Sequence, residues 1–126
     1  MKFTAIPLNE AGNEAYICEF EGAANVENDI VAALGSQLDV ILEQGVRWAI
    51  VDFSNVLFIS SAGVGTLLSR RRKFRKSNGD LILCNVSEEI MYVLKELNLV
   101  DHMRIVPNCS EAVKSISAAS ASQQSV

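Results

Sequence analysis

The sequence predicts an α/β fold in which about four helices pack on a mixed sheet of four to five strands. Short apolar runs alternate along the chain with longer segments whose apolar residues recur at helical spacing. Turns rich in Gly and Asn separate them. A short turn joins the first two apolar runs, which indicates a hairpin. The later runs are separated by helices, and we therefore expect them to pair in parallel.

The strands are expected where apolar runs are short and bounded by turns. The run at 47–53 is apolar almost throughout, which is typical of a central strand covered on both faces. The turn between the first two strands occupies residues 9–13. The expected strands are 3–8, 15–20, 47–53, 80–86 and 104–106.

Each expected helix begins at a polar residue that can accept a hydrogen bond from a free backbone N–H group. The predicted helix starts are Asn25, Ser60 or Ser61, Ser87, and Asn108 or Ser110. Residues 117–126 contain only Ser, Ala, Gln and Val, and we expect them to form a frayed or disordered tail. The chain therefore predicts one domain at 1–116.

Composition narrows the class of protein. The chain has 126 residues, 49% of them hydrophobic and 21% charged, which suits a single globular domain with a sizeable core. No apolar run approaches the roughly 20 residues of a membrane helix. The first residues also lack the apolar stretch of a signal peptide. We therefore expect a cytoplasmic protein with no membrane partner.

The cysteines and the histidine indicate no cofactor and no metal site. Cys18, Cys84 and Cys109 are odd in number and widely spaced, so reduced and buried thiols are expected. No CxxC pattern occurs, and His102 is the single histidine. His102 has no acidic or cysteine partner at a suggestive spacing, and we assign it no role.

Six of the eleven basic residues lie within residues 70–76. A basic run of this kind can bind nucleic acid. Lys and Arg near the end of a helix, however, also interact favourably with its dipole and keep its outer face in water. Phe74 is the only aromatic residue in the run. We therefore expect no nucleic-acid partner.

The segment that opens with two serines predicts a docking surface. Each glycine inside a helix costs about 1 kcal/mol relative to alanine. Gly63 and Gly65 in the first turn therefore indicate a close approach, either by the sheet beneath or by a partner outside. Ser61, Gly65 and Ser69 follow at intervals of four and so share a helix face. A phosphate on Ser61 would also be compatible with a helix N-terminus.

A serine hydrolase and a nucleotide-binding protein are the alternatives to this interpretation. Ser61 on a strand-to-helix turn resembles a nucleophile elbow, but the Gly-x-Ser-x-Gly pattern is absent and His102 would be the only available base. A nucleotide site would rest on Gly63 and Gly65 without the lysine of a phosphate-binding loop. We therefore expect a protein that is not an enzyme.

The stretch around these serines resembles the signature of a known family. Residues 51–56 read Val-Asp-Phe-Ser-Asn-Val, and residues 59–65 read Ile-Ser-Ser-Ala-Gly-Val-Gly. In this order they resemble the signature of STAS domains, and more narrowly that of bacterial anti-sigma factor antagonists. The resemblance covers nearly the whole chain, from the initial hairpin to the helix that contains Leu97.

The resemblance implies a partner-switching cycle. In that family the unphosphorylated antagonist binds an anti-sigma factor that is also a serine kinase, and the sigma factor is released. The kinase then phosphorylates the serine at the helix start, the complex dissociates, and a PP2C-type phosphatase resets the antagonist. Carried over here, the phosphoacceptor is Ser61. Many phosphorylated members have Asp just before the acceptor, whereas this chain has Ser60, which stays the second choice.

The resemblance also bears on two other residues and leaves a second function open. Asn25 lies in a region that contacts the kinase in the family, but a helix cap is the favoured interpretation of this residue. Asp52 could shape the partner surface, but capping of the turn at Ser54-Asn55 is the favoured interpretation. Related STAS proteins without a phosphorylated serine serve as scaffolds or as accessory subunits of lipid transporters, and this remains the alternative.

Overall fold

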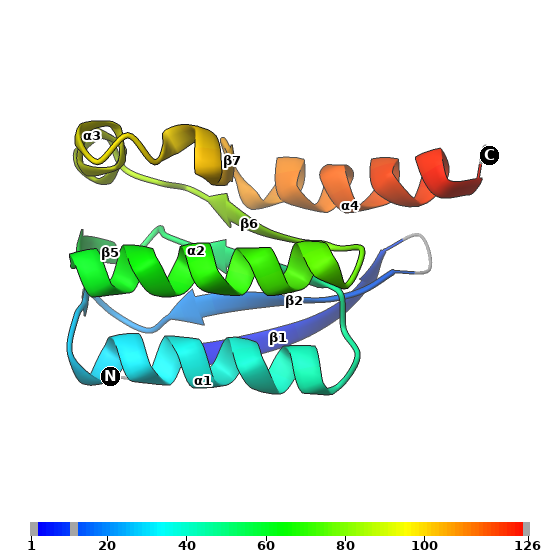
Figure 1. Cartoon of the computed structure of the whole chain (residues 1–126), viewed down its shortest axis with the longest axis horizontal. Helices are drawn as coiled ribbons and strands as arrows, with labels where there is room; N and C mark the ends of the chain where they lie inside the picture. Colours follow the sequence, from blue (N-terminus) through cyan, green and yellow to red (C-terminus); the bar gives the residue numbers. More distant parts are fainter. Residues whose placement is uncertain (1–2, 11–12, 125–126) are drawn as a thin grey trace.

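The computed structural model describes residues 3–10 and 13–124 and shows helices on both faces of a central sheet (Figure 1). The elements are β1 (Phe3–Glu10), β2 (Asn13–Phe20), β3 (Ala24–Val26), α1 (Asp29–Glu43), β4 (Trp48–Asp52), β5 (Val56–Ile59), α2 (Ser61–Lys76), β6 (Asp80–Cys84), α3 (Glu88–Glu96), the 3₁₀ turn η1 (Val100–His102), β7 (Arg104–Val106) and α4 (Cys109–Gln124). This confirms the predicted α/β class, the initial hairpin and four helices.

The main sheet has five strands in the order β1-β2-β4-β6-β7. β1 and β2 are antiparallel, and every other neighbouring pair is parallel, as the crossover helices require. In this register Asp52 at the end of β4 lies beside Cys84 at the end of β6 and Glu19 near the end of β2. The carboxyl ends of the parallel strands therefore form one edge of the sheet.

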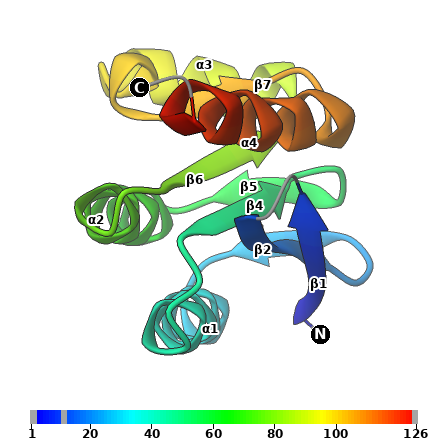
Figure 2. The same cartoon turned by 90° about the vertical axis from the view of Figure 1, so that its right-hand side faces the viewer.

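The two faces of the sheet are covered by different helices (Figure 2). Side chains alternate along β4, so that Ala49 and Val51 join a core with α1, α2 and α3, whereas Trp48 and Ile50 join a second core with α4. Burial on both faces explains why this strand is apolar almost throughout.

The start of α1 differs from the prediction. Asn25 does not cap this helix. It lies in β3, which pairs in parallel with β5 to form a separate two-stranded sheet. The Ala24 N–H donates to the Asn55 carbonyl at 2.7 Å, and the Ser60 N–H donates to the Val26 carbonyl at 2.9 Å. These bonds hold the segment extended, and Asn28 precedes the first helical residue instead.

The last helix, α4, extends beyond the predicted domain boundary at residue 116. The helix continues to Gln124. Its start is capped by the Asn108 side chain, which accepts from the Glu111 N–H at 2.9 Å. Ala112 and Ile116 are fully buried against the sheet. Alanine has the highest helix propensity, which favours continuation of the helix past its last buried contact.

The basic run on α2 is largely held by acidic partners within the chain. Asp80, 1% exposed at its side chain, pairs with Arg71 at 2.9 Å and with Arg75 and Arg104 at 3.4 Å. Asp39 on α1 pairs with Arg70 at 2.9 Å. The basic run therefore has a structural role, because these ion pairs join α2 to its neighbours on two sides.

Among the helices of residues 3–10 and 13–124, none has the length and apolar character that a membrane span requires.

Candidate functional site

The candidate site lies at the carboxyl edge of the sheet, where β4 ends and α2 begins. Asp52 shapes the turn between them. Its carboxylate accepts from the Ser54 N–H at 2.9 Å, from the Ser54 hydroxyl, and from the Asn85 side chain at 3.0 Å. Burial raises the pKa of Asp52, but the hydrogen bonds from Ser54 and Asn85 outweigh it and hold the pKa below its usual value. Asp52 is therefore an ionised anchor of the turn.

The two serines at the start of α2 differ in role. Ser60 is the N-cap, in an extended conformation, and its Oγ accepts from the Gly63 N–H at 3.1 Å. Ser61 is the first helical residue and is exposed. Its hydroxyl has no hydrogen-bond partner among residues 3–10 and 13–124. One serine therefore stabilises the helix, which leaves the other available to a partner.

The charges along α2 favour an anion at this end of the helix. Its first turn contains no acidic residue, whereas its last turn contains Lys73, Arg75 and Lys76. The free N–H groups and the positive end of the dipole are therefore not neutralised by a carboxylate of the same turn. A phosphate on Ser61 would lie beside this positive end.

The surroundings of the two glycines in the first turn of α2 differ. Gly63 is buried, and a Cβ there would come within 2.8 Å of Ile59 Cγ1 and 3.1 Å of the Val26 carbonyl oxygen. The sheet beneath therefore explains Gly63, and this residue is not part of an exposed partner surface. Gly65 is exposed, and a Cβ there would have nothing within 4 Å. Nothing in the described chain requires a glycine at this position.

Ser69, the third member of the predicted face, is half-buried and engaged. Its hydroxyl donates to the Thr66 carbonyl at 3.0 Å and accepts from Arg70 at 3.1 Å. The exposed part of the face therefore consists of Ser61 and Gly65. Asn25, which the structure places in β3, is exposed and pairs in register with Phe58 of β5.

Sequence reasoning missed two exposed apolar residues that precede the serines in the chain. Leu57 is 66% exposed and Phe58 is 45% exposed, and both lie on β5 just before the serines. The apolar run at 56–59 is the sequence signal that could have found the strand they lie on. Asn25, Leu57, Phe58, Ser61 and Gly65 are called the switch surface below.

The structure does not bring Ser61 and His102 together. His102 lies against the C-terminal half of α2, where its carbonyl accepts from Arg71 at 2.8 Å. Arg71 is ten residues beyond Ser61, so the two ends are separated by about 15 Å along the helix axis. A Ser–His pair of the kind that hydrolases use is therefore not formed by these residues.

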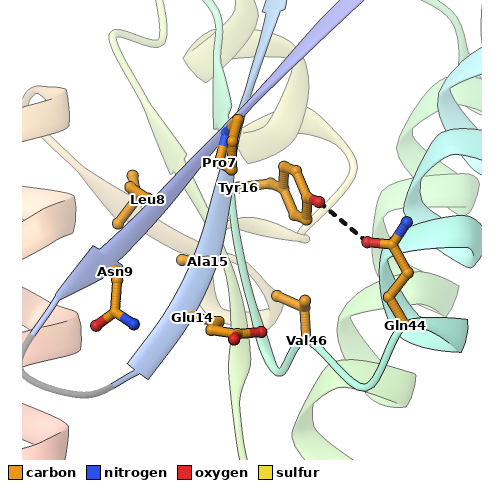
Figure 3. A pocket seen from close by; sticks show the side chains of 8 residues that line it. All are labelled: Pro7, Leu8, Asn9, Glu14, Ala15, Tyr16, Gln44 and Val46. Carbon is orange, nitrogen blue, oxygen red and sulfur yellow. Dashed lines mark hydrogen bonds between the residues drawn. The ribbon is translucent and has the colours of Figure 1, made fainter.

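A hollow of about 570 Å³ lies at the opposite end of the sheet (Figure 3). Its walls include Pro7, Tyr16 and Gln44, and the Tyr16 hydroxyl donates to the Gln44 side-chain oxygen at 3.0 Å. Ala15, which also lines it, pairs with Trp48 at the start of β4, whereas the switch surface follows the end of β4. The hollow and the switch surface are thus separate regions.

All three cysteines are free thiols, and Cys18 and Cys84 are buried, as predicted. Cys18 is buried, and burial raises the pKa of its thiol to about 12. Cys109 is only half-buried, and its Sγ lies 2.7 Å from the Sγ of Cys84. These two thiols and Asp52 place three possible metal ligands within 4.8 Å of one another, where the sequence predicted none. The spacing along the chain does not reveal this pair, because β6 and the start of α4 meet only in the fold.

The comparisons with solved structures agree with this architecture. The chain is 20% identical to the anti-sigma factor antagonist SpoIIAA in its unphosphorylated form, with a TM-score of 0.69 over 91% of this chain and 97% of that one. An anti-sigma factor antagonist from Mycobacterium paratuberculosis is 15% identical, with a TM-score of 0.71 over 90% and 93% of the two chains. A murine anion transporter, Solute Carrier 26 family member A9, is 17% identical with a TM-score of 0.67, over 82% of this chain but 18% of its own.

At these identities the likeness establishes the fold. The family follows from the sequence itself, because the family profile described as the STAS domain matches residues 23–112. That range includes the turn held by Asp52, the serine pair and all of α2. The chain belongs to the STAS domain family.

Proposed function

We propose that this protein is an anti-sigma factor antagonist that switches partners when Ser61 is phosphorylated. The observation that supports this most directly is the division of roles between the two serines. Ser60 fills the N-cap of α2, and Ser61 next to it is exposed with a free hydroxyl. A kinase can therefore modify Ser61 without removing the hydrogen bond that starts the helix.

The chemistry of the switch is phosphoryl transfer from a partner kinase. The Ser61 hydroxyl oxygen attacks the γ-phosphorus of ATP, a new O–P bond forms, and the bond to the ADP leaving group breaks. The hydroxyl proton passes to a base of the kinase. The product has about −1.5 to −2 charges at neutral pH. The kinase supplies the catalysis, and this chain supplies only the acceptor.

The switch surface is suited to a partner that the phosphate would then exclude. Leu57 and Phe58 offer exposed apolar area, and Gly65 leaves room for close approach. Such a partner would desolvate Ser61, and a dianion in that interface would be costly. The fold would tolerate the same phosphate at the N-terminus of α2. The modification would thus act on binding rather than on folding.

The partner is an anti-sigma factor with serine kinase activity, and a PP2C-type phosphatase would remove the phosphate in the cytoplasm. SpoIIAA, which is similar to this chain in fold, has been solved in an unphosphorylated form and in a phosphorylated form. The phosphorylated form is 22% identical to this chain, with a TM-score of 0.66. The two forms of SpoIIAA motivate the same cycle here.

The test is binding to the anti-sigma factor kinases of the source organism, measured for the wild-type protein and for Ser61→Asp, Ser61→Ala and Ser60→Ala. We expect Ser61→Asp to weaken binding at least tenfold, at an unchanged melting temperature. Ser61→Ala should bind but accept no phosphate from ATP. Ser60→Ala should lose stability and still be phosphorylated at Ser61. Full affinity in Ser61→Asp would contradict the switch.

A second candidate function is a constitutive accessory domain of a transporter or signalling complex. The observation that favours it is the likeness to a segment of the murine anion transporter. In that case a partner would bind without regard to the charge on Ser61. The same Ser61→Asp measurement therefore separates the two functions.

A further inference from the structure

Two thiols lie in contact beneath the turn that leads to the switch surface. Cys84 ends β6, and Cys109 begins α4 on the same face of the sheet. Their sulfur atoms are 2.7 Å apart, which is well inside the contact distance of two unbonded sulfurs. A disulfide bond is about 2.05 Å long. A small movement of the half-buried Cys109 side chain would therefore bring the two sulfurs to bonding distance.

We propose that Cys84 and Cys109 form a reversible intramolecular disulfide that joins the end of β6 to the start of α4. The third cysteine is excluded by the fold. Cys18 is buried in the core on the other face of the sheet, among residues that pack against α1 and α2. The pair is therefore selected by geometry, although 25 positions separate the two residues along the chain.

The two sulfurs have unequal access, which sets the order of the reaction. Cys84 is fully buried, whereas Cys109 is half-buried and can meet a small oxidant first. With hydrogen peroxide, the Cys109 thiolate attacks one oxygen, an S–O bond forms, the O–O bond breaks, and the leaving hydroxide takes up the proton that the thiol had released. The Cys84 thiolate then attacks the sulfenic sulfur, the S–S bond forms, the S–O bond breaks, and the second hydroxide is protonated in the same way. Two thiols and one peroxide thus give one disulfide and two waters.

The surroundings keep the reduced pair from reacting quickly. Burial raises the pKa of both thiols, and the carboxylates of Asp52 and Glu19 raise it further. The thiolate is the reactive form. Oxidation should therefore be slow at neutral pH and faster in mild alkali.

The bond would close a loop that contains α3, η1 and β7. Closing a loop of about 25 residues restricts the unfolded chain, and the expected rise in melting temperature is about 10 °C for a domain of this size. The disulfide would also remove the Cys109 thiol as a hydrogen-bond partner of Asp52, while Ser54 and Asn85 would continue to hold that carboxylate.

The experiment is peptide mapping of the full chain after treatment with hydrogen peroxide in mild alkali. Free thiols are alkylated, and the protein is digested with trypsin without reductant. We expect peptide 77–95, which contains Cys84, to be linked to peptide 105–114, which contains Cys109. The linked pair should lack two hydrogens relative to the separate peptides, and dithiothreitol should separate it. The melting temperature should rise by about 10 °C on oxidation.

Cys18→Ala is the matched control and should form the same linked pair, whereas Cys109→Ala should form none and show no rise in melting temperature on oxidation. The proposal is overturned if both peptides are alkylated after treatment, if Cys109 is oxidised to the sulfinic acid without linkage, or if the link joins two chains. It is also overturned if the purified protein retains stoichiometric zinc that protects both thiols, since the same residues with Asp52 would then be metal ligands.

Discussion

At the scale of single residues, the main result is that the adjacent serines differ in their contacts and exposure. The cap hydrogen bond from Gly63 reaches Ser60 and leaves Ser61 free. We therefore expect Ser60→Ala to lower the free energy of unfolding by about 1 kcal/mol. Ser61→Ala should change it by less than about 0.5 kcal/mol, as for an ordinary surface residue. Urea unfolding of both variants checks this. An equal loss of unfolding free energy in the two variants would mean that both serines cap the helix.

Substitutions at the two glycines in the first turn of α2 form a second matched pair of variants. Gly63→Ala should destabilise the protein by about 1 to 3 kcal/mol, because the new Cβ would press on Ile59 and on the Val26 carbonyl. Gly65→Ala should stabilise it by up to about 1 kcal/mol, because the position is open and alanine is the better helix former.

A larger residue at Gly65 tests the switch surface. Gly65→Leu should leave the melting temperature close to that of the wild type and weaken kinase binding, if a partner approaches the backbone there. Calorimetry for stability and a titration for affinity separate the two effects. Unchanged affinity in Gly65→Leu would remove Gly65 from the switch surface.

At the scale of elements, the sequence predicts well those helices and strands whose signals lie within a few neighbouring residues. α2 begins at Ser61, directly after the capping Ser60, as the sequence predicted, because a capping serine is a local signal. β3 and β5 were missed, since three- and four-residue strands are defined by pairing with each other. Asn25 was misplaced for the same reason. Its hydrogen-bonded neighbour strand is more than 30 residues away in the chain.

The packing of α2 on β6 depends on one buried acid. The Asp80 carboxylate forms ion pairs with Arg71, Arg75 and Arg104. Its removal would leave these three cations close together without the acidic group that they share. We expect Asp80→Ala to cost about 3 to 5 kcal/mol. The exposed Asp101→Ala is the control and should change stability by no more than about 0.5 kcal/mol. Chemical denaturation measures both, and a cost below about 1 kcal/mol for Asp80→Ala would show that the cluster contributes little.

At the scale of the whole molecule, two lowered pKa values predict loss of stability in acid. The hydrogen bond from Arg70 holds the pKa of Asp39 below its usual value, and the Asp52 pKa is lowered by its hydrogen bonds despite burial. Both groups stabilise the fold above the unfolded pKa of about 3.9, and the contribution disappears as the pH falls through the folded pKa.

The free energy of unfolding should therefore decrease below about pH 4. The decrease should be shallower in Asp52→Asn, which has no titrating group at this position. Urea unfolding across a pH series tests this. A slope in Asp52→Asn that equals the wild-type slope would mean that the turn anchor does not contribute to acid stability.

The sequence could not supply the long-range juxtapositions of the whole molecule. The class of fold and the serine helix follow from periodicity and caps. The pairing of Cys84 with Cys109, and the cluster around Asp80, arise only when the sheet and its helices assemble. A pattern of neighbouring residues cannot show a contact between two segments that are far apart in the sequence and meet only after folding.

The central claim is that Ser61 is the acceptor of a reversible phosphate, and phosphosite mapping of the protein from its own cells tests it most directly. Trypsin releases one peptide, Trp48–Arg70, that contains both Ser60 and Ser61, and fragmentation distinguishes them. We expect phosphate on Ser61, with an occupancy that changes between growth and stress. Phosphate on Ser60 alone, or none under any condition, would contradict the account.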